Sequence, residues 1–150
     1  MPAVITFDDS LWPLVTVRWT GVMNDLQFEE FLVRSASFLE RGESYISITD
    51  VRHAGVPSIE HCRALSRWLA AHEARLRERV LCNAILVTSA PLRLSMSLAF
   101  HLKPQPMPHR AVSTLDAALD YALGKLREAG RAEEAEHIQR QFHAAHVQAG

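Results

Sequence analysis

The first third of the chain switches from a strand-like to a helix-like pattern of hydrophobic positions. Val4–Phe7 and Leu14–Trp19 are β-branched and aromatic runs separated by turn residues, which predicts an antiparallel hairpin. Asn24 then precedes apolar residues at helical spacing, and Gln27 completes a capping-box pattern with it. The pattern therefore predicts two strands and a capped helix that ends near Gly42.

The middle of the chain repeats this change of period. Tyr45–Asp50 alternates as a third strand, and Val51–Pro57 has the composition of a loop. Ser58 precedes an amphipathic pattern that continues past Leu76, which predicts one long helix capped by this serine. Leu81–Thr88 is the most apolar strand, as expected for a strand covered on both faces.

The last strand and its flanking helices follow a proline-rich segment. Ser89 begins a helix over 92–102 that is apolar almost all round, and Lys103–Pro108 forces an extended linker. His109–Ser113 predicts a short strand, and Thr114 caps the clearest amphipathic helix in the chain.

Beyond Gly130 the sequence becomes polar and alanine-rich. Its apolar stripe is narrow and includes Ile138 and Phe142. We therefore expect this segment to be an appendage and a chain that ends at Gly130 to remain folded. The predicted parts are a domain over 1–130 and a helical tail over 131–150.

The order of these elements indicates the fold class. After the opening hairpin, strands alternate with helices, and this alternation favours a parallel sheet with right-handed crossovers. The sequence thus predicts an α/β protein with a mainly parallel sheet, an N-terminal antiparallel hairpin, outer helices and a C-terminal helical extension.

Composition and charge narrow the function classes. The chain has 150 residues, which fits one domain, and 16 basic against 17 acidic groups give a net charge of −1. This balance argues against nucleic acid as a partner, and no apolar run is long enough for membrane insertion. The first residues lack a signal-peptide pattern, and the chain has two cysteines. We therefore expect a cytoplasmic protein.

No motif predicts catalysis, a metal or a cofactor. The sequence has no Gly-x-Ser-x-Gly elbow, no His-Glu-x-x-His and no glycine-rich phosphate loop. Cys62 and Cys82 fall on apolar stripes, as packing residues do. His143 and His146 are spaced to share a metal, but scattered surface histidines explain the eight histidines better. We expect a protein that is not an enzyme.

Several short segments, in this order, resemble the STAS fold of bacterial anti-sigma-factor antagonists, and more closely its SpoIIAA-like relatives. These relatives share features with CRAL-TRIO lipid-transfer domains. The resemblance covers about residues 3–127. Its segments are the opening hairpin, Ile46–Asp50 before a Ser-capped helix, Leu65–Leu69, Ala84–Pro91 and Ala111–Leu119.

The resemblance gives Ser58 two interpretations. In STAS antagonists a partner kinase phosphorylates a serine at the start of the corresponding helix, within an Asp-Ser-Ser-Gly type motif, and Ser58 matches that position. Val56–Glu60 departs from the motif, because no Asp precedes the serine and no Gly follows it. The alternative role of Ser58 is an ordinary N-cap.

Topology groups a second set of candidates. In an open α/β sheet, ligands favour the carboxyl ends of the parallel strands, where helix N-termini and cations can hold an anion or an acidic peptide. Every such sheet has caps at this edge, so the set is also explained by helix capping alone. The candidate binding edge comprises Asn24, Arg52, His53, Ser58, Ser89, Arg93 and Thr114.

Together these observations favour a non-enzymatic, STAS-like module for protein interaction and signalling. The alternative is a carrier of a small lipid-like or anionic ligand, which would release that molecule on purification. The helix over 92–102 has more apolar residues than one sheet contact can bury, so we expect a homodimer. The candidate self-association residues are Leu94, Phe100, Ile138 and Phe142.

Overall fold

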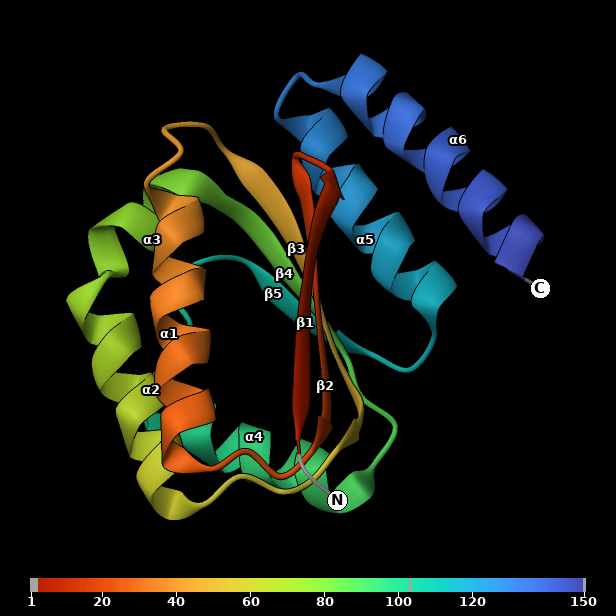
Figure 1. The fold of residues 1–150 in the computed structure, drawn as a ribbon. Helices are drawn as coiled ribbons and strands as arrows, with labels where there is room; N and C mark the ends of the chain where they lie inside the picture. Colours follow the sequence, from red (N-terminus) through yellow and green to blue (C-terminus); the bar gives the residue numbers. More distant parts are fainter. Residues whose placement is uncertain (1–2, 103, 150) are drawn as a thin grey trace.

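The computed structural model describes residues 3–102 and 104–149, without the side chains of residues 99, 100, 102 and 146–149. Five strands form one sheet in chain order (Figure 1). Strands β2 to β5 are parallel, and β1 is antiparallel to β2 at one edge. The strands are β1 (Val4–Leu11), β2 (Leu14–Gly21), β3 (Tyr45–Ala54), β4 (Val80–Leu86) and β5 (His109–Val112).

The helices cover both faces of this sheet. Figure 1 shows α1, α2 and α3 over one face, α5 and α6 over the other, and α4 along the lower edge. The predicted α/β class with its antiparallel hairpin is confirmed. The helices are α1 (Asp25–Leu39), α2 (Ile59–Ala71), α3 (Glu73–Arg79), α4 (Ala90–Leu102), α5 (Leu115–Glu128) and α6 (Ala132–Ala149).

Strand β3 is longer than the sequence pattern predicts. Residues 51–54, predicted as part of a loop, continue the strand, because β2 runs to Gly21 and supplies partners for them. Thr20 pairs with His53, and Gly21 pairs with Ala54. The register shifts between Arg18 and Thr20, so this pairing follows an irregularity that local sequence does not reveal.

The long helix predicted after Ser58 is two helices. The backbone leaves helical geometry at His72, where φ is −110° and ψ is 15°, and the His72 ring Nδ1 lies 2.9 Å from the Trp68 carbonyl oxygen. The resulting bend lets Leu76 join the core cluster that also contains Tyr45 and Val80. The pattern of apolar positions continued across the bend, so it could not locate the break.

The two helix layers stand at different distances from the sheet. Helix α5 packs closely on β3 and β4, where Ile46, Ile48 and Ala84 are fully buried. Helices α1 and α2 stand farther from the strands (Figure 1). Aromatic side chains such as Phe28, Phe38 and Tyr45 pack between these helices and the sheet. This difference leaves a cavity between the sheet and the α1 and α2 layer.

Helix α6 belongs to the core. Ala135 and Ile138 are buried in the same cluster as Leu123 and Leu126 of α5, and Ile138 is only 1% exposed. The division into a domain over 1–130 and a separable tail over 131–150 stays a prediction, and these buried contacts argue against it. The narrow apolar stripe of α6 predicted little burial. In the structure α6 lies against both α5 and β1, so the residues of this stripe are covered by two elements.

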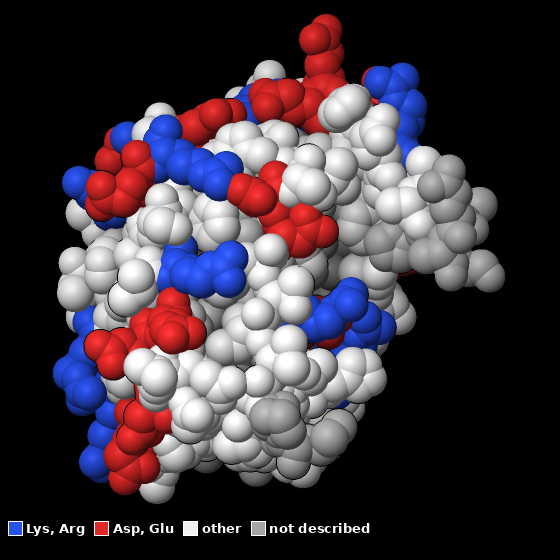
Figure 2. Space-filling view, viewed as in Figure 1, with Lys and Arg blue, Asp and Glu red and all other residues white. Residues whose placement is uncertain are grey.

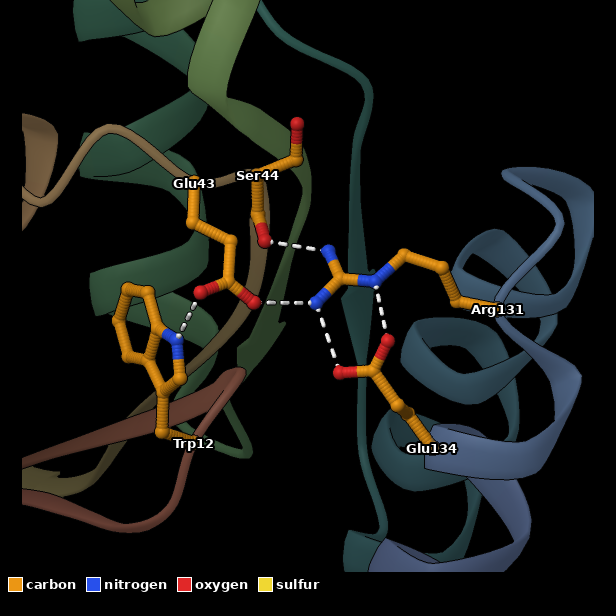
Figure 3. Close-up of polar contacts among 5 residues, drawn as sticks. All are labelled: Trp12, Glu43, Ser44, Arg131 and Glu134. Carbon is orange, nitrogen blue, oxygen red and sulfur yellow. Dashed lines mark hydrogen bonds and ion pairs between the residues drawn. The ribbon is translucent and has the colours of Figure 1, made fainter.

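A polar network joins the start of α6 to the loop just before β3 (Figure 3). Arg131 donates from Nη1 to the Ser44 carbonyl oxygen at 2.6 Å and from Nη2 to Glu43 at 2.7 Å. It also makes a two-point contact with Glu134, and this hydrogen bonding lowers the pKa of Glu134. Trp12 Nε1 donates to Glu43 at 3.2 Å, so the network joins the hairpin to α6.

Candidate functional site

The four predicted helix caps lie at the carboxyl ends of the parallel strands, and each satisfies its own helix. Asn24 Oδ1 accepts from the Gln27 amide at 2.8 Å within the predicted capping box. Ser58 Oγ accepts from the His61 amide at 3.1 Å, and Thr114 accepts from the Ala117 amide. Ser89 Oγ accepts from the Leu92 amide at 3.3 Å, as serine N-caps do at a helix start.

Arg52, one of the predicted cations at this edge, already forms an ion pair with Asp50. Its Nε and Nη2 donate to the two carboxylate oxygens of Asp50 at 3.0 and 2.9 Å, and its amide donates to Oδ1 at 3.1 Å. Arg18 adds a weaker contact at 3.4 Å. Burial by itself raises the pKa of Asp50, but the hydrogen bonds and positive charges of the arginines outweigh burial and lower it.

The other predicted cations do not converge on a common point. Arg93 Nη2 donates to the Val87 carbonyl oxygen at 3.1 Å, and His53 is exposed. With Arg52 neutralised by Asp50, the described residues do not assemble a cluster of unpaired cations around the helix N-termini. Anion binding at this edge therefore stays a prediction from topology.

The same edge is apolar where it meets solvent. The exposed fractions are 61% for Val22, 65% for Leu26, 50% for Val56 and 68% for Ile59. The Gly55 amide donates to the Gly21 carbonyl oxygen at 2.9 Å, which holds the β2–α1 and β3–α2 loops together. We call these four aliphatic residues the apolar edge.

Away from the apolar edge, the surface carries many charged side chains. Figure 2 shows acidic and basic side chains mixed along the left of the view, where α1 and α2 lie, and along its upper edge. The lower centre of the view is mostly uncharged. The sequence has an acidic first third and a basic middle, and on the face shown the fold places the two signs side by side.

The candidate self-association residues do not form one surface. Leu94 on α4 is 63% exposed, and Leu98 on the same helix is similarly exposed. Ile138 packs inside the core and is unavailable to a second copy, and Phe142 packs partly against the same cluster. The Phe100 side chain lies outside the described residues. Self-association through α4 therefore stays a prediction, and α6 covers α5 rather than α4.

Between the sheet and the α1, α2 and α4 layer lies a cavity of about 170 Å³. Most of its lining is aromatic or aliphatic. A polar strip crosses the sheet side, where Thr49 Oγ1 donates to Asn83 Oδ1 at 2.9 Å and Asn83 Nδ2 donates to Gln105 Oε1 at 3.4 Å. The sequence analysis did not find this cavity.

A signal for the cavity was present in the central strands. Ser47 and Thr49 alternate with Ile46 and Ile48 in β3, and Asn83 takes the same side in β4. A central strand covered on both faces usually has apolar residues on both, so polar residues on one face indicate a space beside them. The pairing of Ser47 with Asn83 across the two strands places these groups together.

Cys82 is buried, as its apolar strand suggests, whereas His61 is a buried histidine rather than a surface one and packs against Phe28 and Asp25. Cys82 is fully buried in the α5-side core, and burial raises the pKa of its thiol to about 12, which keeps it protonated. In the part of the chain that the structure describes, no group of three His, Cys, Asp or Glu residues is placed to hold a metal ion. Within the same residues, no helix has both the length and the apolar character to cross a membrane.

Comparison with known proteins gives a fold. No protein-family model matches the chain, and no curated protein matches it. An uncharacterised protein of the DUF3478 family from Shewanella loihica PV-4, with a SpoIIAA-like fold, is similar at a TM-score of 0.59 and 13% identity, over 81% of this chain and 94% of that one. The chain has a SpoIIAA-like fold.

A second solved structure supports this STAS-like assignment. An anti-sigma factor antagonist from Mycobacterium paratuberculosis is similar at a TM-score of 0.50 and 13% identity, over 80% of this chain and 93% of that one. At this identity the likeness concerns the fold. The sequence-based resemblance to the SpoIIAA-like fold is confirmed.

In this SpoIIAA-like fold Ser58 is an exposed N-cap. This role predicts how Ser58→Ala and Ser58→Asp change the stability of the protein. Ser58→Ala removes the acceptor of the His61 amide and is expected to lower the free energy of unfolding by about 1 kcal/mol. Ser58→Asp keeps an acceptor and adds a negative charge that the helix N-terminus favours, so its free energy of unfolding should be close to that of the native protein. Urea denaturation of the three proteins measures this, and an Asp variant less stable than the Ala variant would contradict the capping role.

Proposed function

We propose that this protein is a non-enzymatic regulatory module that binds a protein partner through the apolar edge. The observation that carries the proposal is the group of four aliphatic side chains, each at least half exposed, on two loops and two helix starts. Single exposed aliphatic residues are ordinary, but four of them on the loops and helix starts at one end of the sheet are what an interaction surface needs. A protein partner with apolar side chains would cover it.

One further observation supports a regulatory role, and another supports the cellular compartment. A solved structure of the same fold is described as an anti-sigma factor antagonist, a protein that acts through another protein. Cys62 and Cys82 are both free, which fits a reducing compartment, and we place the protein in the cytoplasm.

Ser58 precedes Ile59 of the apolar edge in the sequence, and this position suggests how binding is controlled. Its exposed hydroxyl stands between Val56 and Ile59 in the sequence, and Pro57 precedes it. A phosphate on Ser58 would add about two negative charges beside these aliphatic groups while remaining compatible with the helix N-terminus. Phosphorylation would therefore weaken an apolar contact without unfolding α2.

Site-specific photo-crosslinking in cells of the native organism tests the docking surface. A benzophenone amino acid at position 59 is expected to give one discrete protein adduct, because Ile59 lies within the proposed contact. The matched control is position 33, since Val33 is 65% exposed on α1 but lies outside the apolar edge. We expect no discrete adduct there.

A second variant separates binding from folding. Ser58→Asp should reduce the adduct at position 59 several-fold at unchanged thermal stability, because it places a charge within the contact. An adduct of twice the mass of the chain would identify the occupant as a second copy, as in the predicted homodimer. Equal labelling at positions 59 and 33, or no adduct at either, would refute the proposal.

A further inference from the structure

Strand β1 leaves one edge of the sheet open. It pairs with β2 on one side, and in the part of the chain that the structure describes no strand lies on its other side. Figure 1 shows β1 at the front of the sheet, with α1 to its left and α6 to its right, and neither helix crosses it. An open edge presents main-chain N–H and C=O groups that another strand can pair with.

The hydrogen bonding of β2 shows which groups of β1 face this edge. The Ile46 amide donates to the Pro13 carbonyl oxygen, so the odd-numbered residues at the start of β2 bond to β3. The even-numbered residues of β2 therefore bond to β1. Their partners on β1 are Val4, Thr6 and Asp8. The main-chain groups of Ile5 and Phe7 then point away from β2, toward the open edge. We call these two residues the open pair.

The outward positions on either side of the open pair are already occupied. Gln27 Nε2 donates to the Ala3 carbonyl oxygen at 2.8 Å, and the Trp12 amide donates to the Asp9 carbonyl oxygen at 3.0 Å. For the outward amides and carbonyl groups of the open pair, the described residues provide no hydrogen-bond partner. The open edge is therefore a short stretch of strand with a defined beginning and end.

The half of β1 that contains the open pair lacks the usual protection of an edge strand. Charged residues, prolines and bulges commonly prevent edge pairing. In β1 the charges of Asp8 and Asp9 and the shift of register between Asp8 and Leu11 lie beyond the open pair. Val4–Phe7 is uncharged, and its β-branched and aromatic residues favour a strand. This half of β1 lies in the mostly uncharged lower centre of the view in Figure 2.

We propose that the open pair joins two copies of this chain into a dimer with one continuous sheet. Antiparallel pairing about a twofold axis at Thr6 sets Ile5 of each copy opposite Phe7 of the other, and these residues exchange their outward hydrogen bonds. The same register sets the two Thr6 side chains opposite each other on the other face of the sheet. An aromatic residue beside a β-branched one and a threonine beside a threonine are both favourable cross-strand pairs.

The hydrogen bonds at the ends of the open pair select this register. Pairing centred one residue earlier would need the Ala3 carbonyl oxygen, which already accepts from Gln27. Pairing centred one residue later would need the Asp9 carbonyl oxygen, which already accepts from the Trp12 amide. Pairing centred on Thr6 uses the open pair alone and leaves both bonds intact. The edge is thus complementary to itself, which favours a second copy as the partner.

This inference does not rest on the proposed function, because no residue of the apolar edge belongs to β1. It also places self-association at β1 and not at α4.

Sedimentation velocity of the full chain tests the dimer. One strand pair is a small interface, so we expect self-association between micromolar and millimolar concentration, with a species of twice the 16.9 kDa of one chain. Thr6→Lys and Thr6→Glu should each weaken this association at least tenfold, because each places two like charges opposite each other. Val33→Lys is the matched control, since Val33 is 65% exposed on α1, and it should leave the association unchanged.

A mixture of the two variants separates the contact from a loss of folding. In an equimolar mixture of Thr6→Lys and Thr6→Glu, the lysine of one copy lies opposite the glutamate of the other. The mixture should therefore form the dimer that neither variant forms by itself at the same total concentration.

Amide hydrogen exchange, followed by nuclear magnetic resonance, locates the contact in the native protein. Exchange of the Ile5 and Phe7 amides should slow at least tenfold when the dimer is the main species, because only the dimer bonds them. The Thr6 amide bonds to β2 in both states, so its exchange should not change with protein concentration.

Three results would overturn the proposal. A native chain that stays monomeric at millimolar concentration would refute it and leave the edge to an extended segment of another protein. A dimer that the Thr6 variants do not weaken, or that gives the Ile5 and Phe7 amides no protection, would form through another surface. A mixture of the two variants that stays monomeric would show that the two Thr6 side chains do not lie opposite each other.

Discussion

A chain that ends at Gly130 is expected to lose about 4–6 kcal/mol of unfolding free energy, a large part of the total for a domain of this size. Removal of α6 takes away buried Ile138 and exposes part of Leu123 and Leu126 on α5. Each fully buried large aliphatic side chain contributes about 1.5–3 kcal/mol. The truncation also removes Arg131, which holds Glu43 and the Ser44 carbonyl group.

Urea denaturation measures this loss as a lower midpoint. The matched control is a chain that ends at Ala145, which keeps Ala135, Ile138 and the Arg131 network. Its free energy of unfolding should be within about 1 kcal/mol of that of the full chain, because it retains these buried residues. A Gly130 truncation as stable as the control would restore the interpretation of α6 as an appendage.

Replacing Arg52 should have the next largest effect. Arg52→Leu removes two hydrogen bonds from the carboxylate of Asp50, whose side chain is only 3% exposed, and is expected to cost about 2–4 kcal/mol at pH 7. Arg18→Leu is the matched control, since Arg18 contacts the same carboxylate at 3.4 Å from a side chain that is 55% exposed. Its cost should stay below about 1 kcal/mol.

The pH dependence identifies the carboxylate as the cause. The pKa of Asp50 is lowered in the folded protein, so its contribution to stability is present above the ordinary value of about 3.9 and is lost as the pH falls through the folded pKa. Arg52→Leu raises the pKa of Asp50. The stability difference between native protein and variant should therefore be largest near neutral pH and shrink in acid.

A double variant completes this measurement. Asp50→Leu in the Arg52→Leu background removes the unpaired carboxylate and should recover most of the stability at pH 7. Urea denaturation at pH 7 and pH 3.5 gives both quantities. A cost for Arg52→Leu that equals the cost for Arg18→Leu, or that does not change with pH, would show that the ion pair does not stabilise the fold.

The sequence by itself determined the local elements and the fold class, because these depend on short-range chemistry. Caps at Asn24, Ser58 and Thr114 place side-chain acceptors next to helix amides a few residues away, and the structure confirms all three. The switch between periods of two and 3.6 residues gave the order of strands and helices. That order restricts the topology to a mainly parallel sheet.

The tertiary structure alone decided which surfaces are available. Ile138 lies on a narrow stripe in the sequence, but two neighbouring elements bury it. Arg52 belongs to a cationic edge in the sequence, but β3 extends past it and places it against Asp50. Trp19 has the pattern of a core strand residue, and the distance of α1 and α2 from the sheet makes it the wall of a cavity. Burial, pairing and empty space depend on contacts between distant segments, and no local pattern specifies them.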